Sequence, residues 1–277
     1  MARRLNSRPL IGAALLGAGL MVALPQVAWA TATADINGVI FPVGIVPGGN
    51  QIQSGFINET SIANIGNVLS GTGYVNAISL SSNSSQQTWS NGQNGVMLAF
   101  AFSGYTVSSI TLPAGTTSGT VDFTGGTVDF YTLAAGTNLN TGSVAADLAT
   151  VRGGTLWLST SAAVDAPGGV TLTGSIPPGD SASNFVTAGN GSGYLDVTGG
   201  PAGPSFHTGT FANPYDTTGV SDMSFTSDFS NSSTGNDFPL TGSATLKANA
   251  VPEPMSAALL GFGVLALGFA YRRRTAA

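Results

Sequence analysis

The chain has 277 residues and no cysteine, which excludes disulfide bonds, thiolate catalysis and cysteine-based zinc or iron–sulfur sites. Residues 31–250 contain twelve acidic residues and two basic ones, Arg152 and Lys247, so this part carries a net charge of −10 that the whole-chain value of −5 conceals. Such a surface repels phosphate backbones and anionic headgroups. We therefore exclude nucleic acid as a partner and favour neutral glycans and divalent cations.

Residues 1–30 predict a cleavable secretory signal peptide. Three arginines lie within the first eight residues, and an apolar stretch runs from Leu10 to Leu24. Small residues at Ala28 and Ala30 fit a signal-peptidase cleavage site, and the apolar stretch is short for a membrane span. We expect export and a mature chain that begins at Thr31.

Residues 31–250 predict an all-β extracellular domain. Short runs rich in β-branched and aromatic residues alternate with Gly-rich turns, which is typical of a many-stranded antiparallel protein. The predicted architecture is an antiparallel β-sandwich or jelly-roll-like body, with two stacked β-domains as the alternative. Ser81–Gln87 and Pro167–Asp180 are expected to form long loops. The predicted strands are Val39–Val46, Gln51–Ile57, Gly73–Leu80, Val96–Phe102, Thr106–Leu112, Gly119–Phe123, Thr127–Leu133, Thr155–Thr160, Val170–Thr173, Gly193–Thr198, Ser205–Phe211, Met223–Phe229 and Ala244–Ala248.

One local repeat, GTVDF-TG-GTVDF, covers Gly119 to Phe130. In each copy the valine and phenylalanine are expected to share the core face, with Asp122 and Asp129 facing solvent. The intervening Thr124-Gly125 predicts a tight hairpin. The alternative for the two aspartates is a weak cation site, with Ca²⁺ as the candidate ion; no other cofactor is expected.

The body contains one helix-like segment, Ser143–Val151. Ser143 fits the N-cap, and Val144, Leu148 and Val151 would share one face. Gly153 would end the helix.

Signals of catalysis are scarce. The one histidine, His207, has Ser205 and Asp216 nearby in sequence, but a strand-surface role is favoured over a triad. The segment GNGSGYLDV at Gly189–Val197 faintly resembles calcium-binding nonapeptides, and a Gly-rich turn into a strand is favoured. We expect no enzyme, and the alternative left open is a secreted carbohydrate-active enzyme that uses an Asp pair or Glu59.

Aromatic side chains supply a second alternative, a sugar-binding module. Trp89 lies in the polar stretch SSQQTWSNGQNG and is the best single candidate for a ligand contact, whereas Trp157 in TLWLS predicts core packing. Other aromatic residues that could stack on sugar rings are Tyr74, Tyr105, Tyr194 and Tyr215.

Residues 251–277 carry the most specific pattern in the chain. Pro252, Glu253 and Pro254 are followed by the apolar stretch Met255–Tyr271 and then by the basic residues Arg272, Arg273 and Arg274. Seventeen helical residues span about 25 Å, close to the lower limit for a bilayer crossing. We therefore predict a C-terminal transmembrane helix with its basic end in the cytoplasm.

This order of motif, apolar helix and basic cluster resembles the PEP-CTERM sorting signal of exported bacterial proteins. The resemblance implies recognition by an exosortase near Pro252, Glu253 and Pro254, in a Gram-negative bacterium that makes exopolysaccharide. It also implies a precursor anchored in the inner membrane, then transfer to the cell surface or extracellular matrix.

Segments of the body are similar to PEP-CTERM proteins associated with flocculation. They are GNVLSGTGYVNAIS (Gly66–Ser79), TGGTVDFYTL, GGTLWLS and GSGYLDVTGG. The similarity implies a non-enzymatic role in exopolysaccharide-associated aggregation, as in flocs or biofilm, and brings no catalytic residue with it.

Overall fold

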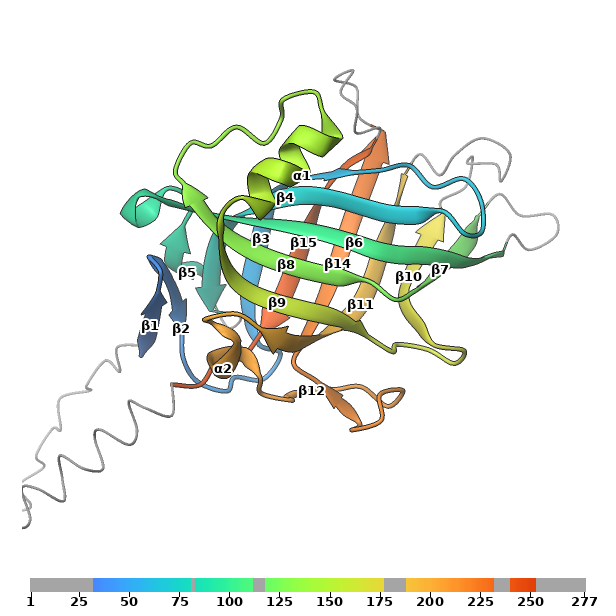
Figure 1. Ribbon diagram of the computed structural model, residues 1–277. Helices are drawn as coiled ribbons and strands as arrows, with labels where there is room; N and C mark the ends of the chain where they lie inside the picture. The colour runs from blue at the N-terminus through green and yellow to red at the C-terminus, as the bar shows by residue number, and fades with distance from the viewer. Residues whose placement is uncertain (1–31, 81–82, 112–117, 177–187, 232–239, 253–277) are drawn as a thin grey trace, which may run out of the picture. The chain divides into compact units, whose positions relative to one another are not determined.

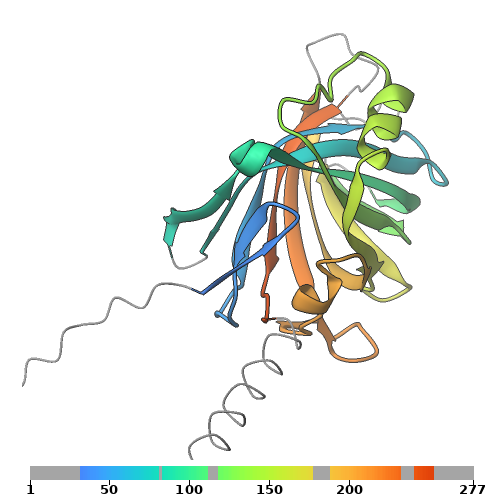
Figure 2. The same cartoon turned by 60° about the vertical axis from the view of Figure 1, so that its left-hand side comes forward.

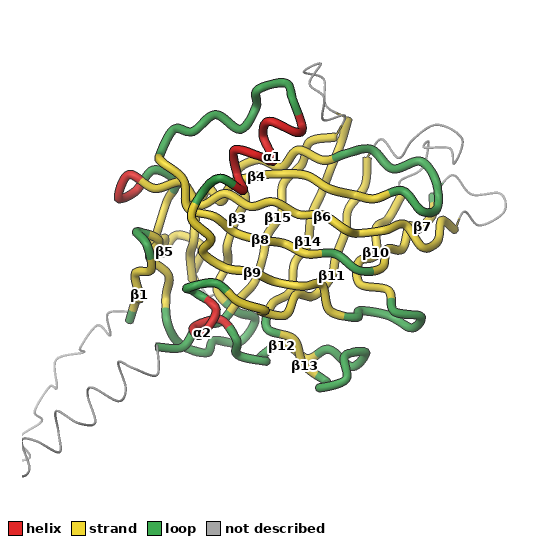
Figure 3. Tube along the Cα trace, in the orientation of Figure 1, coloured by secondary structure: helices red, strands yellow, loops and turns green. Residues whose placement is uncertain are grey.

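The computed structural model describes residues 32–80, 83–111, 118–176, 188–231 and 240–252, all within one compact unit, Thr31–Ala277. Antiparallel strands dominate these residues (Figure 3). The signal peptide predicted for residues 1–30 and most of the predicted sorting signal, residues 253–277, lie outside them.

Eight strand paths follow one another along the chain, and each pairs antiparallel with the next. Two of the paths are broken in the middle, so each consists of two strands. Pairing of β15 with β3 closes the ring into a barrel-like sheet (Figure 1). In order, the paths are β3 (Asn50–Glu59), β4 (Val68–Leu80), β6 (Val96–Thr111), β7 (Gly119–Thr124) with β8 (Thr127–Ala134), β9 (Thr155–Ala163) with β10 (Val170–Ile176), β11 (Ala188–Gly199), β14 (Met223–Asn231) and β15 (Leu240–Ala248).

The all-β antiparallel class is therefore confirmed. The described strands form one continuous barrel-like sheet, and the finer expectation of a sandwich or jelly roll, in which two sheets face each other, is not confirmed. Closure of this kind could not be inferred from strand periodicity, because the alternation of inward and outward residues is the same in both architectures.

Smaller elements surround the sheet. The β1 (Thr33–Ile36) and β2 (Val39–Pro42) hairpin packs beside β5 (Asn83–Ser90), which extends β4 outside the ring (Figure 2). Helix α1 (Val144–Arg152) lies over the outer face of β4 and β6, as Figure 1 shows. The remaining elements are a 3₁₀ turn (Gln93–Gly95), α2 (Gly203–Phe206), β12 (Phe211–Ala212) and β13 (Val220–Ser221).

The helix predicted at Ser143–Val151 is confirmed. The Ser143 hydroxyl accepts a hydrogen bond from the Ala146 amide at 3.3 Å, and Gly153 ends the helix. Three other secondary-structure predictions were wrong, and one of them is the long loop expected at Pro167–Asp180, which contains strand β10. Ser81–Gln87 is mostly strand β5 rather than a loop, and Ser205–Phe211 is mostly α2 and coil rather than a strand.

The GTVDF repeat is not a tight hairpin. Both copies pair with β6 in succession, so β7 and β8 form one path that is broken at Gly125-Gly126. The break is matched by Gly104 in β6, and all three glycines have positive φ. The two copies are seven residues apart, and in an unbroken strand this odd spacing would turn the second copy to the opposite face. The break compensates for it, so the valine and phenylalanine of both copies face the core, as predicted.

The interior of the sheet contains, besides aliphatic side chains, phenylalanine rings that lie on glycines. Four rings sit directly opposite a glycine in the neighbouring strand, and a Cβ built on any of these glycines would crowd or overlap the ring. The distances would be 2.5 Å from Gly71 to Phe102, 2.7 Å from Gly189 to Phe229 and 3.0 Å from Gly193 to Phe225, and shorter still from Gly73 to Phe100. The pairs are Gly71–Phe102, Gly73–Phe100, Gly189–Phe229 and Gly193–Phe225.

The glycines of GNGSG therefore belong to strand β11, not to a turn. At one end of the sheet the interior is closed by a cluster of Phe41, Trp157 and Phe206, with ring centroids 4.8 to 6.1 Å apart. Trp157 is fully buried and its indole N–H donates to the Ile36 carbonyl at 3.0 Å, which confirms its predicted core role.

Glu59 points into this interior because of a bulge in β3. Ile52 and Ser54 line the interior at even positions, the register shifts at Gly55, and Ile57 and Glu59 then line it at odd positions. Burial, with a smaller contribution from the Asp228 charge, raises the pKa of the Glu59 carboxyl from 4.5 to about 7.

The raised pKa predicts how Glu59 affects stability. Below pH 4.5 the carboxyl is protonated in both the folded and the unfolded chain. Between pH 4.5 and 7 the unfolded chain ionises first, so stability falls as pH rises, and above pH 7 the full cost of about 3 kcal/mol is present. Glu59→Gln should thus raise the free energy of unfolding by about 2–3 kcal/mol at pH 8 and change it little at pH 4.

Denaturant unfolding of both chains at the two pH values measures this difference. The other carboxyl groups titrate in both chains, so they cancel in the comparison. An equal effect of the substitution at pH 4 and pH 8 would contradict the buried, proton-binding state of Glu59.

Candidate functional site

A groove on the outer face of the sheet brings two aromatic rings together with amide and hydroxyl groups. This outer groove has a volume of about 390 Å³. Its lining comes from β3, β4, the start of β6 and the segment before α1. The lining residues are Gly55, Phe56, Tyr74, Asn91, Met97, Thr137, Asn138, Leu139 and Asn140.

The bulge at Gly55 that turns Glu59 inward also shapes the floor of this groove. Phe56 and Tyr74 are a cross-strand pair on the outer face, with ring centroids 6.5 Å apart and planes tilted by 33°. The Tyr74 ring lies across Gly55, where a Cβ would be 2.5 Å from the ring. Gly55 therefore lets the tyrosine lie flat on the sheet, and both rings remain partly exposed.

The wall of the groove is the segment 135–142, and two of its residues anchor it. Leu139 is buried with Met97 and Val151 under α1. The Thr141 amide and hydroxyl both donate to the buried Asp147 carboxylate, the hydroxyl at 2.7 Å. The wall is thus held in place without a regular element of its own.

The polar groups of the groove are neutral. Asn138 and Asn140 come from the wall, and the Asn91 side-chain oxygen is buried without a hydrogen-bond partner. The lining contains no acidic or basic residue. Ring faces flanked by neutral donors and acceptors suit a ligand that presents both C–H faces and hydroxyl groups, and they offer no group for acid–base catalysis.

The prediction that Trp89 is the best candidate for a ligand contact is wrong. Its side chain is fully buried, and the indole N–H donates to the Gly38 carbonyl at 3.1 Å. The reason is tertiary: β5 pairs with β4, and the β1–β2 hairpin covers it, so that Thr88 also donates to the Ile40 carbonyl. A polar stretch therefore contains a core residue.

Asp122 and Asp129 face outward and have separate partners. Asp122 accepts hydrogen bonds from Ser109 at 2.7 Å and Thr173 at 3.2 Å, and Asp129 accepts one from Ser159. Within the described part of the chain, no group of three or more His, Asp or Glu side chains is placed to hold a metal ion.

His207 pairs with Asp222 rather than with Ser205 or Asp216. Its Nδ1 lies 3.0 Å from the Asp222 carboxylate, which also accepts from the Val197 and Gly209 amides. The Ser205 hydroxyl is buried and has no partner. The histidine ring is largely exposed, so this arrangement fixes a loop and does not form a serine–histidine pair.

Of the predicted sorting motif, Pro252 is exposed at the last described position. Glu253, Pro254, the apolar stretch 255–271 and Arg272, Arg273 and Arg274 lie outside the described residues. Among the residues that the structure does describe, no helix is long and apolar enough to cross a membrane.

Comparison of the chain with protein-family models, curated proteins and solved structures finds no significant match. Any functional argument therefore starts from the residues themselves. Of the aromatic residues considered in the sequence, the structure brings Tyr74 to the groove and buries Tyr105. Phe56, Asn91 and the wall segment were missed, and the one available signal was a glycine, Gly55, inside a strand pattern.

Proposed function

We propose that this chain is an exported, non-enzymatic protein of the cell surface or extracellular matrix, and that its outer groove binds neutral sugar units of an exopolysaccharide. The observation that carries the glycan part is the Phe56–Tyr74 ring pair flanked by the neutral amides Asn91, Asn138 and Asn140. A sugar ring offers an apolar face for the rings and hydroxyls for the amides.

Charge supports a neutral glycan over an anionic one. Residues 31–250 carry a net charge of −10, while the groove lining is uncharged. An anionic polymer would be repelled by the surrounding surface, whereas a neutral one would not. Cross-linking of matrix strands by many weakly bound copies fits a role in flocculation or biofilm.

A secreted carbohydrate-active enzyme has less support. Glycosidases of the common kind need two carboxyl groups about 5–9.5 Å apart across the cleft. The outer groove has no carboxyl group in its lining, and Glu59 is the one carboxyl among the residues that line the interior cavity. Among the described residues, neither the outer groove nor the interior cavity contains such a pair of carboxyl groups.

The glycan proposal predicts a defined loss on removing one ring. Phe56→Ala should weaken binding of a neutral polysaccharide such as dextran by roughly twofold to tenfold, because an aromatic contact contributes about 0.5–1.5 kcal/mol beyond burial. Affinity electrophoresis in dextran-containing gels measures the change. Tyr215→Ala is the matched control, since Tyr215 is half exposed and lies away from the groove lining.

Two outcomes would contradict this proposal. One is equal retardation of the Phe56→Ala and Tyr215→Ala chains in dextran. The other is stronger retardation by anionic alginate than by dextran at low salt, since the −10 charge opposes that preference.

Sorting by an exosortase is a separate part of the proposal, and it rests on the order of Pro252, Glu253 and Pro254, the apolar stretch and the arginines. Replacing the three motif residues by alanine should leave the precursor in the inner membrane, because the apolar stretch still anchors it. Deleting residues 255–277 should instead release soluble protein into the periplasm. Cell fractionation followed by immunoblotting distinguishes the membrane-bound from the released protein. Normal processing of the alanine variant would contradict the sorting proposal and identify the apolar stretch as a plain membrane anchor.

A further inference from the structure

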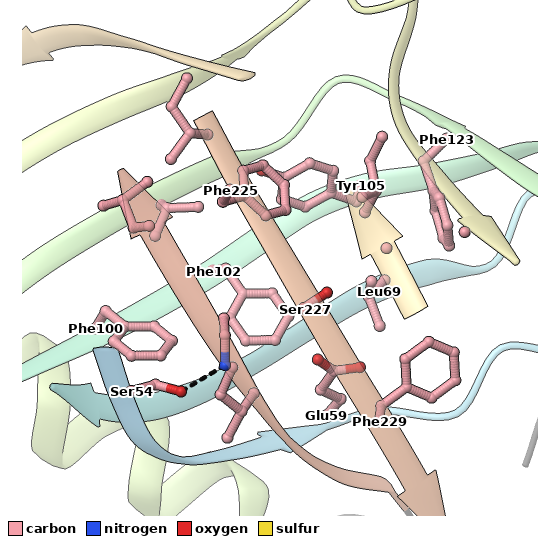
Figure 4. A pocket seen from close by; sticks show the side chains of 18 of the residues that line it. Ser54, Glu59, Leu69, Phe100, Phe102, Tyr105, Phe123, Phe225, Ser227 and Phe229 are labelled. Carbon is pink, nitrogen blue, oxygen red and sulfur yellow. Dashed lines mark hydrogen bonds between the residues drawn. The ribbon is translucent and has the colours of Figure 1, made fainter. Parts of the chain in front are cut away.

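A row of small residues crosses five adjacent strands at one level of the barrel interior. Gly174 pairs with Gly191, Gly191 with Ser227, and Ser227 with Ala244, on β10, β11, β14 and β15. The row ends on β3, where the Ser54 hydroxyl accepts a hydrogen bond from the Ala244 amide at 2.6 Å. All five residues line one interior cavity of about 110 Å³ (Figure 4).

Bulky residues form the opposite wall and cannot fill this space. Phe100 and Phe102 of β6 each lie on a glycine of β4, and Phe100 also packs against Phe130 at 5.7 Å between centroids. Both rings are thus packed against the β4 side of the interior. Since protein interiors are otherwise close-packed, a cavity kept open by five small residues side by side is a specific feature of this sequence.

Four polar side chains accompany the apolar lining, namely Ser54, already described, and three others. Figure 4 shows Glu59, Tyr105 and Ser227 among the residues around the cavity. The Tyr105 hydroxyl is buried and has no hydrogen-bond partner among the described residues. Buried polar groups in native proteins are nearly always paired, so the unpaired Tyr105 hydroxyl is a group that a bound molecule can satisfy.

We infer that this interior cavity binds a small, ring-sized apolar molecule that carries one hydroxyl group, of the phenol class. A cavity of about 150 Å³ lined by aliphatic and aromatic side chains is known to hold benzene. The cavity here is smaller, about 110 Å³, so its ligand is limited to a single small ring. The ring would lie against the small row, and its hydroxyl would pair with the Tyr105 hydroxyl. This inference does not depend on the outer groove.

The hydroxyl preference follows from the electrostatics of the site. Asp228 lies behind Glu59 on the outer face of β14, and the two basic side chains of the body, Arg152 and Lys247, do not line the cavity. A ligand carboxylate would therefore meet no cation and would be repelled. A neutral hydroxyl can instead pair with the unpartnered Tyr105 hydroxyl.

Calorimetric titration of the full chain with phenol tests the inference, with a cavity-filling variant as reference. The wild-type chain should show saturable binding with a Kd of about 1 mM or tighter. Ser227→Leu should lose it, because the new side chain occupies the cavity. Thr226→Leu is the matched control, since Thr226 is the exposed, outward neighbour on the same strand, and it should bind as the wild type does.

Tyr105→Phe keeps the test valid if the leucine variant does not fold. This change removes only the unpaired hydroxyl, so phenol binding should weaken roughly fivefold to tenfold while benzene binding stays the same. The inference is overturned if the wild-type chain shows no saturable phenol binding up to about 10 mM. It is also overturned if Ser227→Leu binds like wild type, or if Tyr105→Phe affects phenol and benzene equally.

Discussion

The contact between a phenylalanine ring and a glycine directly opposite it is the constraint on which this structure depends. Four such pairs join β4 to β6 and β11 to β14, on different sides of the barrel-like sheet. Each pair lets a ring lie flat across the neighbouring strand, because no Cβ stands in its way. The rings then occupy the interior close to the wall, and the level between Phe225 and Phe229, where Gly191, Ser227 and Gly174 meet, stays open as the cavity.

Glycines also decide which side chains face inward. The bulge at Gly55 turns Ile57 and Glu59 into the interior and leaves Phe56 beside Tyr74 outside. The matched breaks at Gly104 and at Gly125-Gly126 let one side of β6 pair with β8 and then with β7, while both copies of GTVDF keep their core face. The bulge at Gly55 alone therefore produces both the buried Glu59 carboxyl and the aromatic floor of the outer groove.

Local pattern was enough to predict the strand class, the helix after Ser143 and the inward valine and phenylalanine of each GTVDF copy. It could not predict that Trp89 is buried, because the covering hairpin is more than forty residues away in sequence and supplies the carbonyl of Gly38. It also could not place Glu59, whose direction depends on one register shift. The glycines of GNGSG suggested a turn, since their partners, Phe225 and Phe229, lie in another strand. In each case a long-range pairing overrides the local preference.

The most direct test of ring-on-glycine packing adds one methyl group at a paired glycine and, separately, one at an unpaired glycine. A Cβ on Gly73 would overlap both the Phe100 ring and the Phe56 carbonyl, whereas a Cβ on Gly199, also in a strand, has no atom within 4 Å. Gly73→Ala should lower the free energy of unfolding by about 2 kcal/mol or more, and Gly199→Ala should change it by less than about 1 kcal/mol in either direction. Equal effects of the two substitutions in denaturant unfolding would contradict the claim that ring-on-glycine contacts determine this fold.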